Sequence, residues 1–207
     1  MNLPNRITLA RILLVPVFLL FIVPVPKWIL EADFLSFIHS QLLYADAFIL
    51  KYGNYIAAVF FIIAASTDGV DGYIARKRKE VTKLGIFLDP IADKLLTSAA
   101  LIAMVERSMI SSWVAVIIIG RELIVTGLRL VAAGEGIVIS AGSWGKLKMV
   151  VQIIAISALL MNNFPVSLFS NFRFDRYTMF LAVIVTIYSG YDYIKRNIDA
   201  VIKMDLN

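Results

Sequence analysis

Four aspartates in the first half of the chain have residue types and spacings that suit a metal site. Asp68 and Asp71 are three residues apart, and Asp89 and Asp93 are four residues apart. On helices, at about 100° per residue, each pair shares a face, and two helices joined by a short loop are expected to be neighbours. Four carboxylates so close repel one another unless cations lie among them. Oxygen ligands select hard divalent ions, Mg2+ or Mn2+ first and Ca2+ as an alternative.

The apolar stretches beside these aspartates are too short to cross a membrane by themselves. Residues 55–67 and residues 95–105 are purely apolar or small, whereas a spanning helix needs about 20 residues. The first helix must therefore continue through Asp68 and Asp71, and the second must begin early enough to include Asp89 and Asp93. This places four carboxylates at, or just below, the cytoplasmic membrane interface, where a buried ionisable group indicates a functional site.

A structural role is the alternative interpretation of these residues. Asp89 followed by Pro90 has the pattern of a helix start, and the glycines after Asp68 and Asp71 could mark a turn. Capping, however, explains Asp89 alone and leaves Asp71 and Asp93 as unexplained charges near lipid.

The whole chain has the composition of a membrane protein. It is 60% hydrophobic and 17% charged, with a mean hydropathy of +0.83. The absence of cysteine excludes disulfides, zinc-thiolate sites, iron-sulfur clusters and cysteine nucleophiles, and the single His39 excludes a multi-histidine metal site. The segments long and apolar enough to span a bilayer are residues 8–25, 54–75, 85–105, 112–133, 145–162 and 177–194.

The distribution of lysine and arginine predicts the orientation of these six spans. With both termini in the cytoplasm, twelve basic residues fall on inner segments and five on outer segments, in agreement with the positive-inside rule. A seventh span within residues 27–52 would carry several charges and would reverse the basic cluster of residues 76–83. We therefore expect residues 27–52 to form an outer-face segment with one or two interfacial helices, within a single all-α membrane domain over residues 1–207.

The aspartates belong to a longer pattern, D-x2-D-G-x2-A-R-x8-G-x3-D-x3-D. It is formed by Asp68, Asp71, Gly72, Ala75, Arg76, Gly85, Asp89 and Asp93. This pattern resembles the signature of the CDP-alcohol phosphotransferase family at every fixed position. The resemblance implies six transmembrane helices with cytoplasmic termini, a homodimer, and transfer of a phosphoalcohol group from a CDP-linked donor to a hydroxyl acceptor, with release of CMP.

The resemblance also implies a role for each position of the pattern. Asp68, Asp71 and Asp89 would hold Mg2+ or Mn2+, two ions in all, and Asp93 would complete the metal site and act as the general base. The residues implied to adjoin the CDP moiety are Gly72, Ala75, Arg76 and Gly85. The glycines leave room for a nucleotide close to the backbone, and the guanidinium offers a planar fork for phosphate oxygens.

Basic residues in the fourth and fifth spans suggest where an acceptor binds. Arg121, Glu122 and Arg129 lie in an otherwise apolar span, and Lys146 and Lys148 begin the next one. One interpretation is a basic pocket for an acceptor that carries its own phosphate. The alternative is that Glu122 and Arg129 form a structural pair, while the lysines extend toward anionic headgroups.

Three further segments resemble the bacterial subgroup of this family that uses glycerol 3-phosphate and makes phosphatidylglycerophosphate from CDP-diacylglycerol. They are residues 4–11, residues 120–129 and residues 145–152. The resemblance implies a multi-pass protein of the bacterial cell membrane. The acceptor-phosphate site that it implies consists of Thr8, Arg121, Arg129, Lys146 and Lys148. Two departures weaken this assignment: Met149 replaces a frequent threonine, and residues 27–52 form a longer outer segment.

Two other functions stay open at this point. A member of the same family could use inositol phosphate, serine or a second lipid as acceptor, although a neutral or zwitterionic acceptor would not need the basic residues. A divalent-cation transporter is the more remote alternative, because residues 55–67 and 95–105 offer almost no polar path. The net charge of +5 indicates an anionic membrane surface rather than nucleic acid.

Overall fold

The computed structural model describes the backbone of residues 3–78, 83–134 and 142–204. It describes side chains over the same ranges except for residues 3–8, 33, 35, 67–90, 93, 133 and 198–204. The described backbone contains helices, turns and loops and no strand, so the prediction of an all-α fold is confirmed.

Six helices of 18 or more residues dominate the described chain, and each overlaps one of the six predicted apolar segments. They are α1 (Leu3–Ile22), α3 (His39–Arg78), α4 (Lys83–Glu106), α5 (Ser112–Gly134), α6 (Ser143–Leu160) and α7 (Phe174–Met204). Three short helices lie between them, namely α2 (Lys27–Leu30), η1 (Asp33–Ile38) and η2 (Val166–Leu168). By length and composition, two helical stretches are sufficient to cross a membrane, Ser36–Ser66 and Ser143–Leu160.

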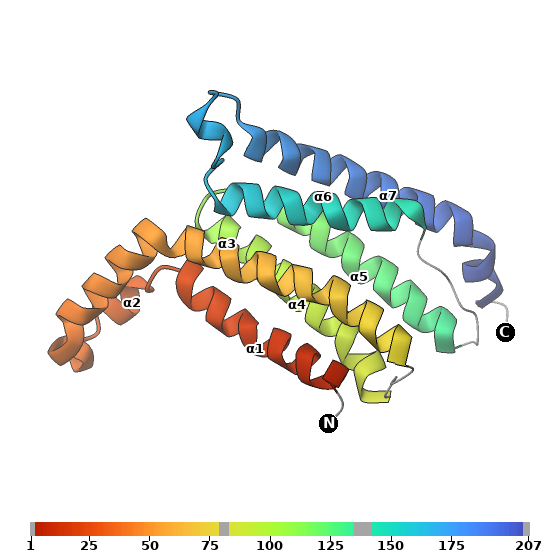
Figure 1. Cartoon of the computed structure of the whole chain (residues 1–207), viewed down its shortest axis with the longest axis horizontal. Coiled ribbons are helices and arrows are strands. Elements are labelled where there is room, and N and C mark those ends of the chain that lie inside the picture. Colours follow the sequence, from red (N-terminus) through yellow and green to blue (C-terminus); the bar gives the residue numbers. More distant parts are fainter. Residues whose placement is uncertain (1–2, 79–82, 135–141, 205–207) are drawn as a thin grey trace. The chain divides into compact units, whose positions relative to one another are not determined.

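The helices form two compact units, the first consisting of Met1–Met109 with Leu160–Asn162. Within it, α1 packs against both α3 and α4 (Figure 1). The fully buried rings of Phe18 and Phe61 join α1 to α3, with their centroids 6.4 Å apart. Beyond the end of α4, the guanidinium Nη1 of Arg107 donates a hydrogen bond of 3.2 Å to the carbonyl oxygen of Ile22, the last residue of α1. Such a bond satisfies a carbonyl that a helix end leaves without a partner.

The structure divides residues 27–52 differently from the prediction. Short helices occur as expected over Lys27–Leu30 and Asp33–Ile38, but residues 39–52 are the first part of α3, which continues unbroken to Arg78. The expected second span, residues 54–75, lies inside this longer helix. Asp46 is one of the charges that count against a seventh span, and its carboxylate accepts a hydrogen bond of 2.9 Å from the backbone N–H of Val25. A tertiary partner thus compensates the charge that the sequence leaves exposed.

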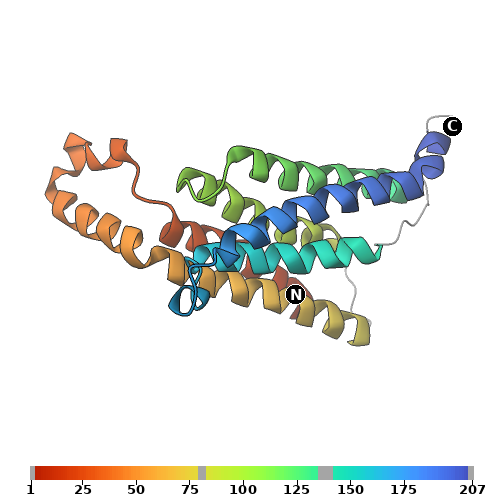
Figure 2. The same ribbon diagram turned by 90° about the horizontal axis from the view of Figure 1, so that it is seen from above.

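The second unit consists of Ile110–Leu159 and Asn163–Asn207 and contains α5, α6 and α7. The helix α7 packs along α5 (Figure 1, Figure 2). Its contact with α6 includes the edge-to-face pair of Trp144 and Tyr188, with ring centroids 4.5 Å apart. Ile118 of α5, Ile156 of α6 and Thr186 of α7 are all fully buried. These contacts fix the positions of α5, α6 and α7 relative to one another, and all three helices carry charged side chains.

A buried aspartate fixes the first turn of α7. The carboxylate of Asp175 accepts hydrogen bonds of 3.0 and 2.8 Å from the guanidinium of Arg173, and its backbone N–H donates to the side-chain oxygen of Asn163. Burial raises the pKa of Asp175, but the hydrogen bonds from Arg173 and from the backbone of Arg176 outweigh it and leave that pKa below its ordinary value. The ionised carboxylate also suits the positive end of the helix dipole.

The close approach of α3 to α1 at Gly53 provides a test of the packing in the first unit. A Cβ added at Gly53 would lie 2.0 Å from the backbone carbonyl oxygen of Phe21. We expect Gly53→Ala to lower the free energy of unfolding by about 1–3 kcal/mol, because backbone must move to admit the methyl group. The measurement is the thermal unfolding midpoint in detergent. Gly127→Ala is the matched control, since an added Cβ there meets nothing within 4 Å; equal midpoints for the two variants would contradict the close approach.

Candidate functional site

The backbone at the acidic motif decides between the two interpretations of the aspartates. The helix α3 continues through residues 68 and 71 to Arg78, and α4 begins at Lys83, so that residues 89 and 93 lie inside it. The predicted continuation of both helices is confirmed. The alternative, in which Asp89 is an N-cap and the Asp-Gly pairs form turns, is wrong for this fold. Capping therefore does not explain the acidic residues.

Helix geometry places the two pairs of aspartates at matching levels. The helices α3 and α4 contact each other, run in opposite directions (Figure 1) and are separated by only four residues. Asp71 lies seven residues before the end of α3 and Asp89 lies six residues after the start of α4, or about 10 Å along each axis. Asp68 and Asp93 are each ten residues from those ends, about 15 Å. The backbone thus brings both pairs to one end of the first unit.

The side chains of the motif lie outside the described ones. This holds for all four aspartates and for Gly72, Ala75, Arg76 and Gly85, and also for Thr8 on α1. Their roles in binding metal, CDP and acceptor phosphate stay predictions. What the structure adds is the pair of continuous helices that carry them.

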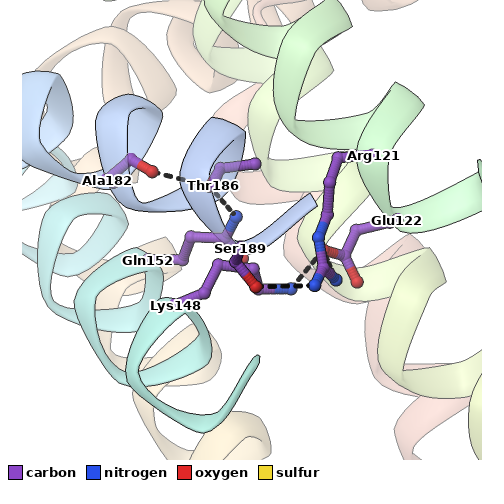
Figure 3. Close-up of polar contacts among 7 residues, drawn as sticks. All are labelled: Arg121, Glu122, Lys148, Gln152, Ala182, Thr186 and Ser189. Carbon is purple, nitrogen blue, oxygen red and sulfur yellow. Dashed lines mark hydrogen bonds and ion pairs between the residues drawn. The ribbon is translucent and has the colours of Figure 1, made fainter. Parts of the chain in front are cut away.

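Charged side chains of α5 and α6 meet beside a hydroxyl group of α7 in the second unit (Figure 3). The ammonium of Lys148 on α6 forms an ion pair with the carboxylate oxygen Oε1 of Glu122 on α5. The same oxygen lies 3.4 Å from Nη1 of Arg121, whose Nη2 donates a hydrogen bond of 2.7 Å to Oγ of Ser189 on α7. Glu122, Lys148 and Ser189 are all buried. We call Arg121, Glu122, Lys148 and Ser189 the basic cluster.

The basic cluster carries one net positive charge, because it combines two cations with a single carboxylate. Away from bulk water, charges interact strongly, and a buried group is stable only with a partner. Glu122 therefore holds the two cations close together against their mutual repulsion.

Arg129, one of the predicted phosphate ligands, has a different environment. Its guanidinium carbon lies 5.7 Å from the centre of the ring of Tyr193 on α7, a cation–π contact. Its Nε is buried and has no hydrogen-bond partner among the described residues. The ring of Tyr193 thus contacts one face of the guanidinium, and the described residues leave its Nε–H group unused as a hydrogen-bond donor.

The structure brings some of the predicted acceptor residues together and separates others. Arg121 and Lys148 meet through Glu122, whereas Lys146 is exposed. The alternative interpretation paired Glu122 with Arg129, but the described ion pairs of Glu122 are with Lys148 and Arg121. The choice of partner depends on how α6 packs against α5, which residue spacing along a single helix does not reveal.

Sequence reasoning missed the contribution of α7. Thr186, Ser189 and Tyr193 follow one another at intervals of three and four residues, the spacing of a single helix face. All three residues are buried. Oγ1 of Thr186 accepts a hydrogen bond of 2.9 Å from the side-chain amide of Gln152 on α6. The stripe of Thr186, Ser189 and Tyr193 is the sequence feature that could have indicated this contribution of α7. A membrane helix rarely buries three hydroxyl groups on one face unless they contact other polar side chains.

Comparison with known proteins gives a consistent result. The model of the CDP-alcohol phosphatidyltransferase family matches residues 1–188. A protein of Bacillus subtilis strain 168, named CDP-diacylglycerol--glycerol-3-phosphate 3-phosphatidyltransferase, is 46% identical over 199 residues, which are 96% of each chain. Two proteins of the same name are 31% identical. One, from Haemophilus influenzae, is matched over 94% of this chain and 92% of its own, and one from Rickettsia bellii is matched over 94% of each.

The ion pair in the basic cluster can be tested through stability. We expect Lys148→Met to lower the free energy of unfolding by about 3 kcal/mol, because it leaves the buried carboxylate of Glu122 without its lysine partner. The matched control, Lys146→Met, removes an exposed charge two residues away and should change stability by no more than about 0.5 kcal/mol.

Adding Glu122→Gln to Lys148→Met should recover part of the loss, since the two changes affect one interaction. The measurement for all three variants is the unfolding midpoint in the same detergent. Equal effects of the two single lysine substitutions would contradict the buried pair.

Proposed function

The chain belongs to the CDP-alcohol phosphatidyltransferase family, and on this premise we propose that it transfers a phosphatidyl group from CDP-diacylglycerol to glycerol 3-phosphate. The products are phosphatidylglycerophosphate and CMP, so the enzyme acts in phospholipid biosynthesis. The observation that carries this proposal is the 46% identity to the Bacillus subtilis transferase over 96% of both chains. The unbroken passage of α3 and α4 through the acidic motif supports it independently.

The acidic motif suits a divalent-metal site. We propose that Asp68, Asp71, Asp89 and Asp93 hold two ions of Mg2+ or Mn2+, because the donors are carboxylates on two adjacent helices at matching levels. When bound, such ions neutralise the pyrophosphate of the donor and the charge that develops on the departing CMP. The residues assigned to the CDP moiety are Gly72, Ala75, Arg76 and Gly85.

The chemical step requires a base at the acceptor hydroxyl. We assign this role to Asp93, which accepts the hydroxyl proton while the hydroxyl oxygen bonds to the phosphorus that carries diacylglycerol. The bond from that phosphorus to the CMP oxygen breaks in the same displacement.

The charge of the basic residues fits an acceptor that carries phosphate. The basic cluster has one net positive charge, and Arg129 adds a second. A phosphate monoester carries about −1.5 to −2 at neutral pH. We assign the acceptor phosphate to Arg121, Arg129, Lys146, Lys148 and Thr8. A serine acceptor has no phosphate to match this charge. Inositol phosphate has one, so the preference for glycerol 3-phosphate over it rests on the similarity to the Bacillus subtilis transferase.

The membrane arrangement follows from the same family. We propose six crossings, with both termini in the cytoplasm, of a single membrane domain in a bacterial cell membrane. The large apolar side chains exposed along the helices support this, because a lipid-facing surface needs them and a water-facing one does not. Examples are Leu20, Leu123, Leu130, Phe180 and Ile187. We also propose a homodimer, as the family resemblance implies.

A reconstitution assay tests the reaction and its acceptor. Purified protein with CDP-diacylglycerol and Mg2+ or Mn2+ should release CMP when glycerol 3-phosphate is added, and much less with serine, inositol phosphate or glycerol. Removal of the metal by EDTA should abolish the release, and added metal should restore it. Acceptor-dependent CMP with serine or inositol phosphate alone would leave the family chemistry in place and overturn the acceptor. Metal flux across sealed vesicles without any CMP release would favour the transporter.

The division of roles among the aspartates predicts different defects for two variants. Asp93→Asn should abolish turnover but largely preserve metal-dependent binding of CDP-diacylglycerol, because the amide keeps an oxygen ligand and loses the basic site. Asp68→Asn should weaken metal and donor binding together, because a full negative charge leaves the metal site. Donor binding and CMP release, each titrated with metal, separate the two outcomes. If both variants lose the same amount of donor binding, and a high metal concentration restores it equally in both, the roles are not divided in this way.

A further inference from the structure

The polar stripe of α7, formed by Thr186, Ser189 and Tyr193, touches a charged or amide side chain at each position. Thr186 contacts Gln152, Ser189 contacts Arg121, and the ring of Tyr193 lies against Arg129. The two arginines of α5 that the proposed function assigns to the acceptor phosphate are therefore both held from α7. The stripe itself carries no charge that could bind a phosphate strongly.

Ser189 fixes the orientation of the Arg121 guanidinium. Its Oγ accepts a hydrogen bond of 2.7 Å from Nη2, while Nη1 faces the carboxylate of Glu122 at 3.4 Å. Two partners on different helices therefore define the plane of the group. An arginine side chain that is free to move loses rotamer entropy when a ligand immobilises it. Contacts made before the ligand arrives reduce that loss.

The held guanidinium keeps donor capacity for a ligand. Its Nε is buried and has no hydrogen-bond partner among the described residues. Each terminal nitrogen of an arginine carries two N–H groups, of which the contacts with Glu122 and Ser189 use one apiece. The guanidinium therefore keeps N–H groups that these two contacts do not use, and such groups can donate to phosphate oxygens.

The absence of a side chain at Gly190 leaves room beside α7 for the aliphatic stem of the Arg121 side chain. A Cβ added at Gly190 would lie 3.2 Å from Cγ of Arg121, closer than ordinary contact. The missing side chain thus lets α5 and α7 approach at this level, which brings Ser189 within hydrogen-bonding distance. A larger residue would displace the arginine stem by a few tenths of an ångström.

We propose that Ser189 and Gly190 are positioning residues that orient Arg121 for the phosphate of the acceptor. The inference rests on the proposed function, and it extends that function to a helix face that binds no substrate itself. A residue with a purely structural role would change stability, or affect both substrates alike. A residue that positions Arg121 changes the affinity for the acceptor and leaves the donor unaffected.

The test compares Ser189→Ala with Ser157→Ala, measured on the full-length protein in lipid. The control removes a hydroxyl of α6 whose oxygen is buried and has no hydrogen-bond partner within the described part of the chain. We expect Ser189→Ala to raise the apparent KM for glycerol 3-phosphate roughly tenfold, the equivalent of one charge-assisted hydrogen bond. The KM for CDP-diacylglycerol should change by less than about twofold. The Ki of inorganic phosphate as a competitor of the acceptor should rise by the same factor as the acceptor KM. Ser189→Thr, which keeps the hydroxyl, should restore most of the acceptor affinity.

A second pair of variants approaches the same arginine from its stem. Gly190→Ala should reproduce the rise in acceptor KM, whereas Gly127→Ala, where an added Cβ meets nothing, should not. An acceptor KM for Ser189→Ala equal to that of Ser157→Ala, in a preparation whose wild type is active, overturns the positioning role and leaves the proposed function standing. A fall in kcat with both KM values unchanged overturns it as well. A wild-type protein that releases no CMP with glycerol 3-phosphate overturns both proposals.

Discussion

An ionisable side chain in an apolar helix is stable only where a partner compensates its charge, and this constraint shapes both compact units. In the second unit, Glu122 lies between Arg121 and Lys148, and Ser189 completes the contacts of the arginine. In the first unit, Asp46 accepts a hydrogen bond from the backbone of Val25 and Arg107 donates one to the end of α1. Apart from the contact between the neighbours Arg121 and Glu122, each of these contacts joins segments distant in sequence, so the polar groups also help to hold particular helices together.

The same constraint explains how much of the fold could be predicted. The positions of the long helices followed from the apolar segments, and the continuation of α3 and α4 through the aspartates followed from their length. The beginning of α3 did not. Asp46 and Lys51 count against an apolar helix when they are read along the chain. In the structure, the carboxylate of Asp46 accepts a hydrogen bond from a backbone N–H, and the ammonium of Lys51 lies 5.0 Å from the centre of the ring of Tyr52. Such partners come from tertiary packing and local side-chain geometry, which hydropathy does not contain.

The candidate site shows the same division between local and tertiary information. The acidic motif lies on two consecutive helices separated by four residues, so its spacing alone reveals a shared end of the unit. The basic cluster draws on α5, α6 and α7, and its residues span positions 121 to 189. Spacing within α5 suggested that Glu122 and Arg129 form a pair, yet the described ion pairs join Glu122 to Lys148 and Arg121. The relative rotation and contact of three helices decide this choice.

The carboxylate of Glu122 reduces the positive charge that would attract a phosphate. The protein nevertheless needs this carboxylate when no ligand is bound. Arg121 and Lys148 approach the same carboxylate oxygen in a buried region, where two uncompensated cations would destabilise the fold by several kcal/mol. Glu122 removes that penalty and still leaves one net positive charge. Arg121 then needs a neutral partner rather than a second anion to fix its direction, and the hydroxyl of Ser189 orients it without cancelling the charge. The protein must hold two cations close together when no substrate is bound. Glu122 therefore compensates their charge, and Ser189 of α7 separately orients the guanidinium of Arg121.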